Sequence, residues 1–438
     1  MKRTVPMACL AVGVLLIGLS LPAAGSGGGG RWSEQDPAYQ NEHLLDVLRD
    51  VGVLDEEAYE RAKQKLSPRL RTALRPCVEL IGTYTFFNDM PEDEVLQYPG
   101  SPDKERGFAL RKASFGLQGR IFYDWLGMKL TASAEQQKDG TLAFGLENAF
   151  LQARFRPEAW TRPGFVPEFG AHLGAMKIPF SRQNLASEPQ MQFINRAVVV
   201  EEIDIRRDLG ATLDAGVALG DQTVAVRLRA GAFNGQGYRV YAADNNSKPM
   251  VVVRAVVDLL GPMAAGEGDL SQSILLGALR DADFRMHKPR VSLGASFLQN
   301  NDIDRTVRAW GVEAEVRWMG LSLLGEYIAT EYDYDLTVDT VGDVRTRRWN
   351  TDGWYLQGGL FVWPRRVELV CRYEEYRIDL LNQTSDEARI ALLTGGVNVH
   401  LTRKNNLKLM ANYIHRSEKK GFPQMDNDSM TVGLSLLF

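Results

Sequence analysis

The sequence has few cysteines and no long hydrophobic run beyond its N-terminal region. One of its three cysteines, Cys9, lies in an N-terminal apolar run, which leaves Cys77 and Cys371 for the rest of the chain. Two cysteines are too few for the disulfide framework that stabilises many exported domains. No apolar run of helical length follows Arg75, and the mean hydropathy is −0.22. These absences exclude a disulfide scaffold and a membrane protein built from helices.

The sequence also lacks the patterns of common catalytic, metal and nucleic-acid sites. Its five histidines stand apart, with no HExxH motif, and no cysteine pair has metal-ligand spacing. Gly-x-Ser-x-Gly is absent, and the glycines of 116–119 and 231–237 precede no predicted helix that could receive a phosphate. The chain carries 51 basic and 55 acidic residues without a basic tract. We therefore predict no enzymatic activity, no cofactor, no metal and no nucleic-acid partner.

The N-terminus has the features of an export signal. Lys2 and Arg3 precede an apolar run from Ala8 to Leu21, and small residues follow from Ala23 to Ser26. A charged start, a short apolar run and a small-residue cleavage site are typical of a secretory signal peptide. We expect residues 1–25 to be removed, leaving roughly 410 residues.

A short region precedes the main part of the chain. The glycines of 25–30 form a flexible tether, and residues 41–66 predict two short helices with Leu44, Leu45, Leu48 and Val51 on one face. Both a small amphipathic appendage and a self-associating coiled segment fit this pattern. We expect residues 26–72 to lie in the periplasm.

Residues 73–438 alternate between apolar and polar positions. At the C-terminus, every second residue from Met430 to Phe438 is apolar, which is typical of a strand with one face in hydrocarbon and one in water. Sixteen such segments, bounded by turn-forming residues, lie near 76–88, 108–121, 125–137, 145–157, 167–178, 207–217, 222–235, 249–260, 289–298, 307–317, 321–332, 351–362, 365–378, 391–402, 405–417 and 427–438. Each is long enough for a tilted strand to cross a bilayer. The prediction is an all-β protein, a 16-stranded antiparallel transmembrane β-barrel in the bacterial outer membrane.

The lengths of the connections support this strand count. Long links alternate with tight ones along the chain, as expected if long loops face outside and short turns face the periplasm. The link at 261–288 is the exception, because it is long where a short turn is expected. Counting 273–279 as a strand would give an odd total, so we leave it out. The alternation also predicts that Cys371 faces lipid and Cys77 the lumen.

Polar residues that point inward over sixteen strands predict a water-filled lumen. The predicted inward basic residues are Lys112, Arg120, Lys129, Arg154, Arg227, Arg229, Arg254, Arg290, Arg317, Arg372, Lys408 and Arg416. The predicted inward acids are Glu79, Glu135, Asp214, Glu313, Glu315, Glu326, Glu368 and Glu374. Because basic residues predominate, the lumen is predicted to favour anions. The alternative is that facing rows of basic and acidic residues only maintain a transverse electric field and keep the pore hydrated, without ion preference.

One stretch carries a family resemblance. Lys177, Ile178, Pro179 and Phe180 form a Lys-x-Pro-Phe motif at a strand end, and the chain returns through Arg206 and Arg207 to a Leu-Gly pair. This stretch resembles the third-loop segment of the phosphate-selective porin O and P family. Further similarities are the segments 145–155 and 288–297, Phe233-Asn234-Gly235, and the terminal aromatic residue that barrel-assembly machinery reads in such proteins.

The resemblance implies a homotrimeric 16-stranded channel whose third loop, residues 179–206, folds inward and narrows the pore. On this basis Lys177, Arg182, Arg196, Arg206 and Arg207 are candidates for the pore constriction. Glu188, Glu201, Glu202 and Asp204 lie in the same loop and weaken a specific phosphate site, because a carboxylate at a narrow point repels the same ion.

The function that we predict is passive diffusion of small hydrophilic solutes, with a mild preference for anions that could include phosphate. One alternative is a plugged, non-conducting barrel that acts as a structural anchor or surface receptor. Another is a barrel-embedded hydrolase. Conductance in planar bilayers separates a channel from an anchor.

Overall fold

The computed structural model describes residues 73–88, 107–122, 125–136, 142–203, 206–220, 223–237, 248–261, 263, 279–284, 288–301, 305–336, 345–378, 388–402, 406–420 and 428–438. The expected signal peptide and the expected helices of 26–72 lie outside the described residues.

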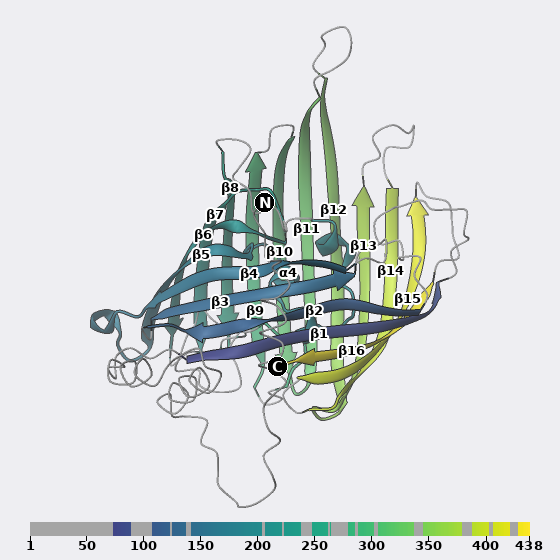
Figure 1. The fold of residues 1–438 in the computed structure, drawn as a ribbon, viewed down its shortest axis with the longest axis horizontal. Coiled ribbons are helices and arrows are strands. Elements are labelled where there is room, and N and C mark those ends of the chain that lie inside the picture. Colours follow the sequence, from purple (N-terminus) through teal and green to yellow (C-terminus); the bar gives the residue numbers. More distant parts are fainter. Residues whose placement is uncertain are drawn as a thin grey trace, which may run out of the picture. The chain divides into compact units, whose positions relative to one another are not determined.

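Sixteen antiparallel strands form one closed barrel (Figure 1). They are β1 (Ala73–Asn88), β2 (Gly107–Arg120), β3 (Leu126–Gln136), β4 (Leu142–Phe155), β5 (Phe165–Lys177), β6 (Arg207–Leu219), β7 (Val224–Phe233), β8 (Met250–Leu259), β9 (Arg290–Asn301), β10 (Arg305–Trp318), β11 (Leu321–Leu336), β12 (Arg345–Trp363), β13 (Val367–Ile378), β14 (Ala388–His400), β15 (Leu407–Lys420) and β16 (Ser429–Leu437). Each strand pairs with its neighbours in sequence, and β1 pairs with β16 to close the ring. The predicted fold class and the strand count are confirmed.

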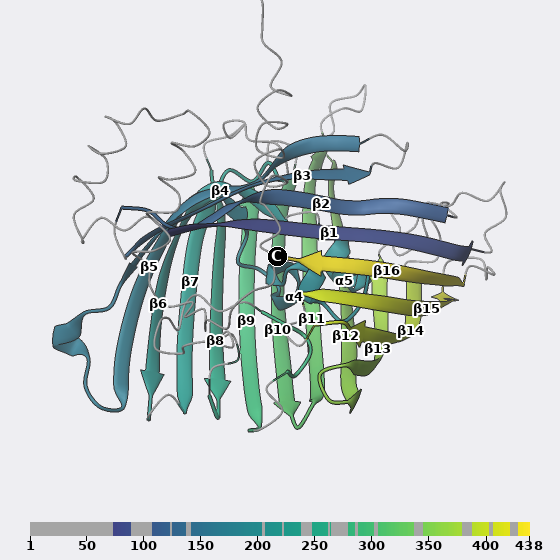
Figure 2. The same ribbon diagram turned by 60° about the horizontal axis from the view of Figure 1, so that its bottom comes forward.

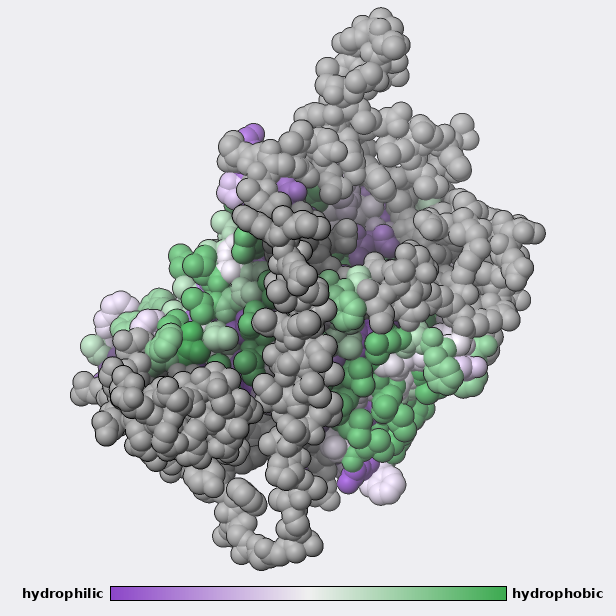
Figure 3. Space-filling view, viewed as in Figure 1, coloured by the Kyte–Doolittle hydropathy of each residue, from purple (hydrophilic) through white to green (hydrophobic). Residues whose placement is uncertain are grey.

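The alternation of the sequence becomes the two faces of the barrel wall. In β9 the side chains of Leu293 and Phe297 are 49% and 43% exposed on the outer face, whereas Arg290, Ser292 and Ser296 are buried inside. The outer surface is accordingly green over the strands in the space-filling view (Figure 3). Because only a strand in contact with lipid gains from exposing leucine and phenylalanine in this way, the pattern fits a bilayer-spanning wall. Cys371 is exposed and Cys77 is buried, as predicted.

Tight turns join the strands at one end of the barrel. The link between β10 and β11 contains only Met319 and Gly320, both with positive φ (49° and 86°). Two central residues with positive φ match the right-handed twist of the flanking strands. Consistent with the sequence, the glycine occupies the second position, where this conformation is least strained.

The predicted strand ends differ most at β11 and β12. The sequence placed them at 321–332 and 351–362, but their pairing continues as far as Leu336 and Arg345. Main-chain hydrogen bonds extend this hairpin through residues that are too polar to contact lipid. The apolar–polar alternation therefore ends before the hydrogen-bonded pairing of the two strands does.

Among the described residues, no helix is long and apolar enough to cross a membrane. The short helices are η1 (Glu158–Trp160), α4 (Arg182–Leu185), η2 (Glu188–Gln190) and α5 (Val198–Glu201). The last three belong to the link between β5 and β6.

Candidate functional site: the lumen and its constriction loop

The link between β5 and β6 lies inside the barrel. We call residues 178–206 the constriction loop; Asp204 and Ile205 lie outside the described residues. Its helix α5 contacts β12 and β13, and η2 contacts β1 and β16. Figure 2 shows α4 and α5 within the ring of strands. The loop therefore crosses the lumen and reaches two different parts of the wall.

One side of the constriction loop is packed in an apolar core. Val198, Val199 and Val200 of α5 and Ile178 and Phe180 near its start are each at most 4% exposed. The wall that they meet contributes Phe233, Met250, Val252, Leu298, Ala309, Leu324, Ile328, Tyr355, Tyr376, Ile390, Leu392 and Ile414 from β7 to β15. Burial of this much apolar surface holds the loop against that wall. The lumen is therefore not hydrated throughout, as the sequence had suggested, but dry along this contact.

The predicted constriction residues hold the loop rather than face open solvent. The Lys177 ammonium donates to the carbonyl oxygens of Asn184, Leu185 and Ala186 at 2.9, 3.2 and 2.6 Å. These carbonyls close the C-terminus of α4, where backbone acceptors have no partner in the helix. Lys177 thus fixes the first turn of the loop to the end of β5.

Arg182 is the most heavily bonded residue of the loop. Its guanidinium donates to Asp281 at 2.6 Å and to Glu315 at 2.9 Å, and its side chain is 3% exposed. Burial alone would lower the pKa of Arg182, but the carboxylates of Glu315 and Asp281 outweigh it and raise the pKa above its ordinary value. The residue is a permanent cation that is fully occupied by the protein.

Of the other three candidates, Arg196 and Arg207 form ion pairs within the loop or with the wall, and Arg206 forms none with a described residue. Arg196 donates to Glu188 at 2.7 Å, and Arg207 donates to Glu147 at 2.5 Å. Arg206 is half-buried, and its buried Nε atom has no hydrogen-bond partner among the described residues. Burial would raise the pKa of Glu188, but Arg196 and then Lys112 outweigh it and hold the pKa well below its ordinary value.

Basic residues of the wall reach across to the loop. Arg372 donates to the carbonyl oxygens of Asn195 and Arg196 at 2.9 and 3.2 Å, and its guanidinium stacks 4.7 Å from the Phe193 ring centroid. Lys408 donates to the carbonyl oxygen of Met191. These predicted lumen cations therefore fasten the loop to β13 and β15.

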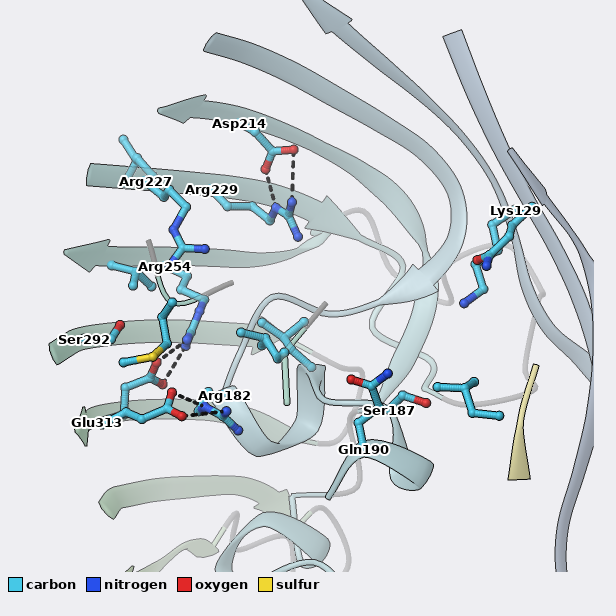
Figure 4. A pocket seen from close by; sticks show the side chains of 18 of the residues that line it. Lys129, Arg182, Ser187, Gln190, Asp214, Arg227, Arg229, Arg254, Ser292 and Glu313 are labelled. Atoms are coloured by element: carbon cyan, nitrogen blue, oxygen red, sulfur yellow. Dashed lines mark hydrogen bonds and ion pairs between the residues drawn. The ribbon is translucent and has the colours of Figure 1, made fainter. Parts of the chain in front are cut away.

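A cavity of about 380 Å³ lies between the constriction loop and the opposite wall. Arg227, Arg229 and Arg254 stand on one side, on the adjacent strands β7 and β8 (Figure 4). Lys129 of β3 stands on the other side, with Ser187 and Gln190 of the loop between. We call this space the lumen cavity.

Every acid that lines the lumen cavity has a basic partner. Glu79 pairs with Lys112 at 2.9 Å, and Glu315 with Arg182 and Arg317. Asp214 pairs with Arg229, and Glu313 with Arg254. Arg227 pairs with Asp258 at 2.7 Å behind the lining. The arginine forks are thus largely satisfied by carboxylates of the wall.

Lys129 is different. It lines the lumen cavity, and no ion pair or hydrogen bond joins its ammonium to any described residue. Lys129 acts on the nearby Glu79 carboxylate through its charge without an ion pair or hydrogen bond, and Glu79 already pairs with Lys112. A cation that no bonded carboxylate neutralises exerts a larger field on its surroundings than an ion pair does.

The remaining predicted lumen residues face inward with partners of their own. Lys112 binds Glu79 and Glu147, Arg290 binds Asp283 at 2.7 Å, and Arg154 lies 3.9 Å from Glu168. Arg416 donates to Ser429 at 3.0 Å, and Arg120 also has a partner. The acids Glu326, Glu368 and Glu374 are buried inside as predicted, whereas the side chain of Glu135 lies outside the described part.

Two sets of lumen residues were missed from the sequence. Glu147 and Asp258 are inward carboxylates, 2% and 0% exposed, that neutralise predicted basic residues. A register shift in the pairing of β3 with β4 falls beside Glu147, so counting every second residue does not find it. The second set, residues 279–284, lies in the link that the sequence could not interpret. Among the described residues, no cluster of three or more His, Cys, Asp or Glu side chains could hold a metal.

Comparison with known proteins identifies the family. The family model of the phosphate-selective porins O and P matches residues 93–438. The chain belongs to this family. It is a porin of the bacterial outer membrane, a channel for passive diffusion of small hydrophilic solutes. No curated protein matches the sequence significantly.

The porin is also similar to several solved structures. OmpT of Vibrio cholerae is 12% identical, with a TM-score of 0.48 over 84% of this chain and 99% of that one. The anion-selective porin from Comamonas acidovorans is 10% identical, with a TM-score of 0.46 over 84% and 99%. The outer membrane channel DcaP of Acinetobacter baumannii is 12% identical, with a TM-score of 0.46 over 85% and 99%.

Proposed function

We propose that solutes pass through the lumen cavity, between the constriction loop and the β1–β9 side of the wall, and that this passage mildly favours anions. The observation that carries the proposal is Lys129, the lining cation that has no ion pair or hydrogen bond with a described residue, in a cavity whose lining acids are all paired with other bases.

The expected selectivity is modest for a physical reason. A unit charge about 6 Å from a hydrated ion contributes about 0.7 kcal/mol in water, and salt at 0.1 M screens part of it. Because Arg227, Arg229 and Arg254 already hold carboxylates, an incoming phosphate would have to compete for their donors. This supports a general anion preference over a dedicated phosphate site.

Reversal potentials in a potassium chloride gradient across a planar bilayer test the proposal. Lys129 attracts an anion and repels a cation, so its removal changes the two permeabilities in opposite directions. With salt screening included, Lys129→Gln should lower the anion-to-cation permeability ratio by about threefold. Lys419→Gln is the matched control, because Lys419 lies on the exposed face of β15 and pairs with Glu375. Cation preference in the wild-type protein, or equal shifts in both variants, would refute the proposal. Replacing chloride by phosphate in the same gradient tests whether phosphate is preferred.

A second candidate is a plugged barrel that serves as an anchor or receptor. The dry contact between the constriction loop and β7–β15 favours it, because this contact fills part of the lumen. Absence of single-channel conductance in a correctly folded protein would support the plugged barrel against the channel.

We further propose that the protein works as a homotrimer, carries out no catalytic step, and is inserted by barrel-assembly machinery that reads its terminal residue, Phe438. Phe438 is 70% exposed in the closed barrel, so its burial is not what holds the last strand in place. Cross-linking in native membranes tests the trimer.

A further inference from the structure

The link between β8 and β9 returns into the barrel. It joins an even strand to an odd one, so it belongs to the side of the tight turns, which is the periplasmic side. Its described part includes residues 279–284, which we call the inner turn. Asp281, Asp283 and Phe284 of this turn are 2%, 0% and 3% exposed. Such burial is unusual for a connection, because loops normally run over the surface.

One end of the inner turn binds the constriction loop. The Asp281 carboxylate accepts hydrogen bonds from the Arg182 guanidinium at 2.6 Å and from the backbone N–H of Gln192 at 3.1 Å. The backbone N–H of Asp281 donates to the carbonyl oxygen of Gln190 at 3.2 Å, and the Arg280 carbonyl accepts from Arg182 at 2.7 Å. Arg280 Nε also donates to the side-chain oxygen of Gln190 at 3.1 Å, and together these hydrogen bonds join the two segments across the lumen.

The other end is fixed to the barrel wall. Asp283 accepts from Arg290 at 2.7 Å and from the backbone N–H of Gly320 at 3.0 Å. The Phe284 ring packs edge-on against Phe361, with ring centroids 5.1 Å apart. The Phe284 carbonyl also accepts from Arg365 at 2.8 Å. The inner turn therefore connects the periplasmic ends of the strands to the constriction loop.

We propose that Asp281 is a positioning residue that holds the constriction loop in place from the periplasmic side and so sets the width of the lumen cavity. Arg182 and Gln190, which Asp281 or its backbone binds, are themselves part of the cavity lining. Burial would raise the pKa of Asp281, but Arg182 outweighs it and keeps the pKa below its ordinary value, so the carboxylate stays charged. The conductance readout of this inference rests on the proposed function.

The test compares Asp281→Asn with Glu375→Gln in single-channel recordings. An amide offers one acceptor oxygen and turns an NH₂ group toward donors, so Asp281→Asn cannot keep both loop contacts. We expect a higher conductance and more open-channel noise in this variant. Glu375→Gln makes the same carboxylate-to-amide change, but Glu375 pairs with Lys419 on the exposed face of the wall, so this control variant should conduct as the wild type does.

A second readout does not depend on conduction. Arg182 and Arg196 are buried in the wild type, so trypsin should not cut the constriction loop in the folded barrel. Asp281→Asn should lose this protection while the heat-modifiable mobility of the folded barrel is kept. In a protein that already carries Arg182→Gln, Asp281→Asn should cause a smaller further loss of protection from trypsin, because Arg182 and Asp281 act through the same contact.

The outcomes separate this inference from the proposed function. A wild-type protein that does not conduct, but whose loop loses protection in Asp281→Asn alone, refutes the channel and leaves the positioning role standing. Unchanged conductance and protection in Asp281→Asn, or equal changes in Glu375→Gln, overturn the positioning role.

Discussion

Replacing Glu147 by glutamine removes the negative charge on which two buried cations converge. Lys112 and Arg207 both donate to one Glu147 oxygen, at 2.6 and 2.5 Å, and Ser114 donates to the other at 2.5 Å. The side chains of Glu147, Lys112 and Arg207 are 2%, 5% and 11% exposed. An amide in this place would leave a net positive charge in a nearly dry site.

The expected loss of stability depends on the hydrogen bonds that Lys112 and Arg207 retain when Glu147 is replaced. Breaking a buried ion pair costs about 3–5 kcal/mol, because the partner remains buried and unpaired. Lys112 keeps Glu79 at 2.9 Å, and Arg207 keeps a long bond to Asn148 at 3.4 Å. We therefore expect a loss near the lower end, about 3 kcal/mol of the free energy of unfolding.

Urea unfolding in lipid vesicles, followed by tryptophan fluorescence, measures this loss. Glu375→Gln is the control, because Glu375 pairs with Lys419 on the exposed face and such surface pairs are worth at most about 1 kcal/mol. A Glu147→Gln protein that is as stable as the wild type would refute the reasoning that buried carboxylates are needed to stabilise these lumen cations.

Three further predictions concern access, pH and backbone shape. A charged methanethiosulfonate reagent should react with Cys77, which lines the lumen cavity, and reduce conductance; Cys77→Ser should abolish the effect although Cys371 remains on the lipid face. The pKa values of Glu188 and Asp281 lie below their ordinary values of 4.5 and 3.8. The two carboxylates therefore stabilise the constriction loop fully above about pH 5, and this stabilisation is lost as the pH falls through the lowered pKa values. Open-channel noise should accordingly rise in acid and stay constant from about pH 6 to 8. Gly174 has φ +128°, and an added Cβ would collide with the backbone of β4, so Gly174→Ala should destabilise the barrel by about 1–3 kcal/mol in the same urea assay.

The fold was predictable because lipid imposes a simple rule. A strand that crosses a bilayer must show apolar side chains at every second position, and this alternation marks each strand of the wall. The long link at 261–288 shows the value of requiring an even number of strands. Leaving the stretch 273–279 out of the count gave sixteen strands, which the closed ring confirms. The predicted strand-like stretch 273–279 lies outside the described residues except for Leu279.

The state of the lumen charges was not predictable by the same rule. Alternation tells which face a residue is on, but an ion pair joins residues from distant strands. Arg182 and Glu315 meet across the lumen although they lie far apart in sequence, and the sequence offers no signal for this pair. Most of the basic residues that had suggested an anion path are therefore paired with carboxylates or bonded to the loop; among the described residues, Lys129 has no ion pair or hydrogen bond, and the Nε atom of Arg206 has no partner.

The dry side of the lumen could have been anticipated in part. In β8, Met250 and Val252 point inward and are buried in the core, while Val251 and Val253 face outward. A stretch that is apolar on both faces indicates that something packs inside the barrel at that point. The identity of the packing partner, the constriction loop, depends on a tertiary contact that local patterns do not encode.

The pairing of β1 with β16 has a consequence for biogenesis. The main chain of Val78 exchanges two hydrogen bonds with Phe438, at 2.9 and 2.8 Å, so the seam joins the two most distant parts of the barrel sequence. Until that seam forms, the first and last strands both present unsatisfied edges, which attract other chains. Contacts of such long range form slowly. The sheet can therefore become a cylinder only once the first and last strands meet at the membrane, and the exported chain needs protection until then.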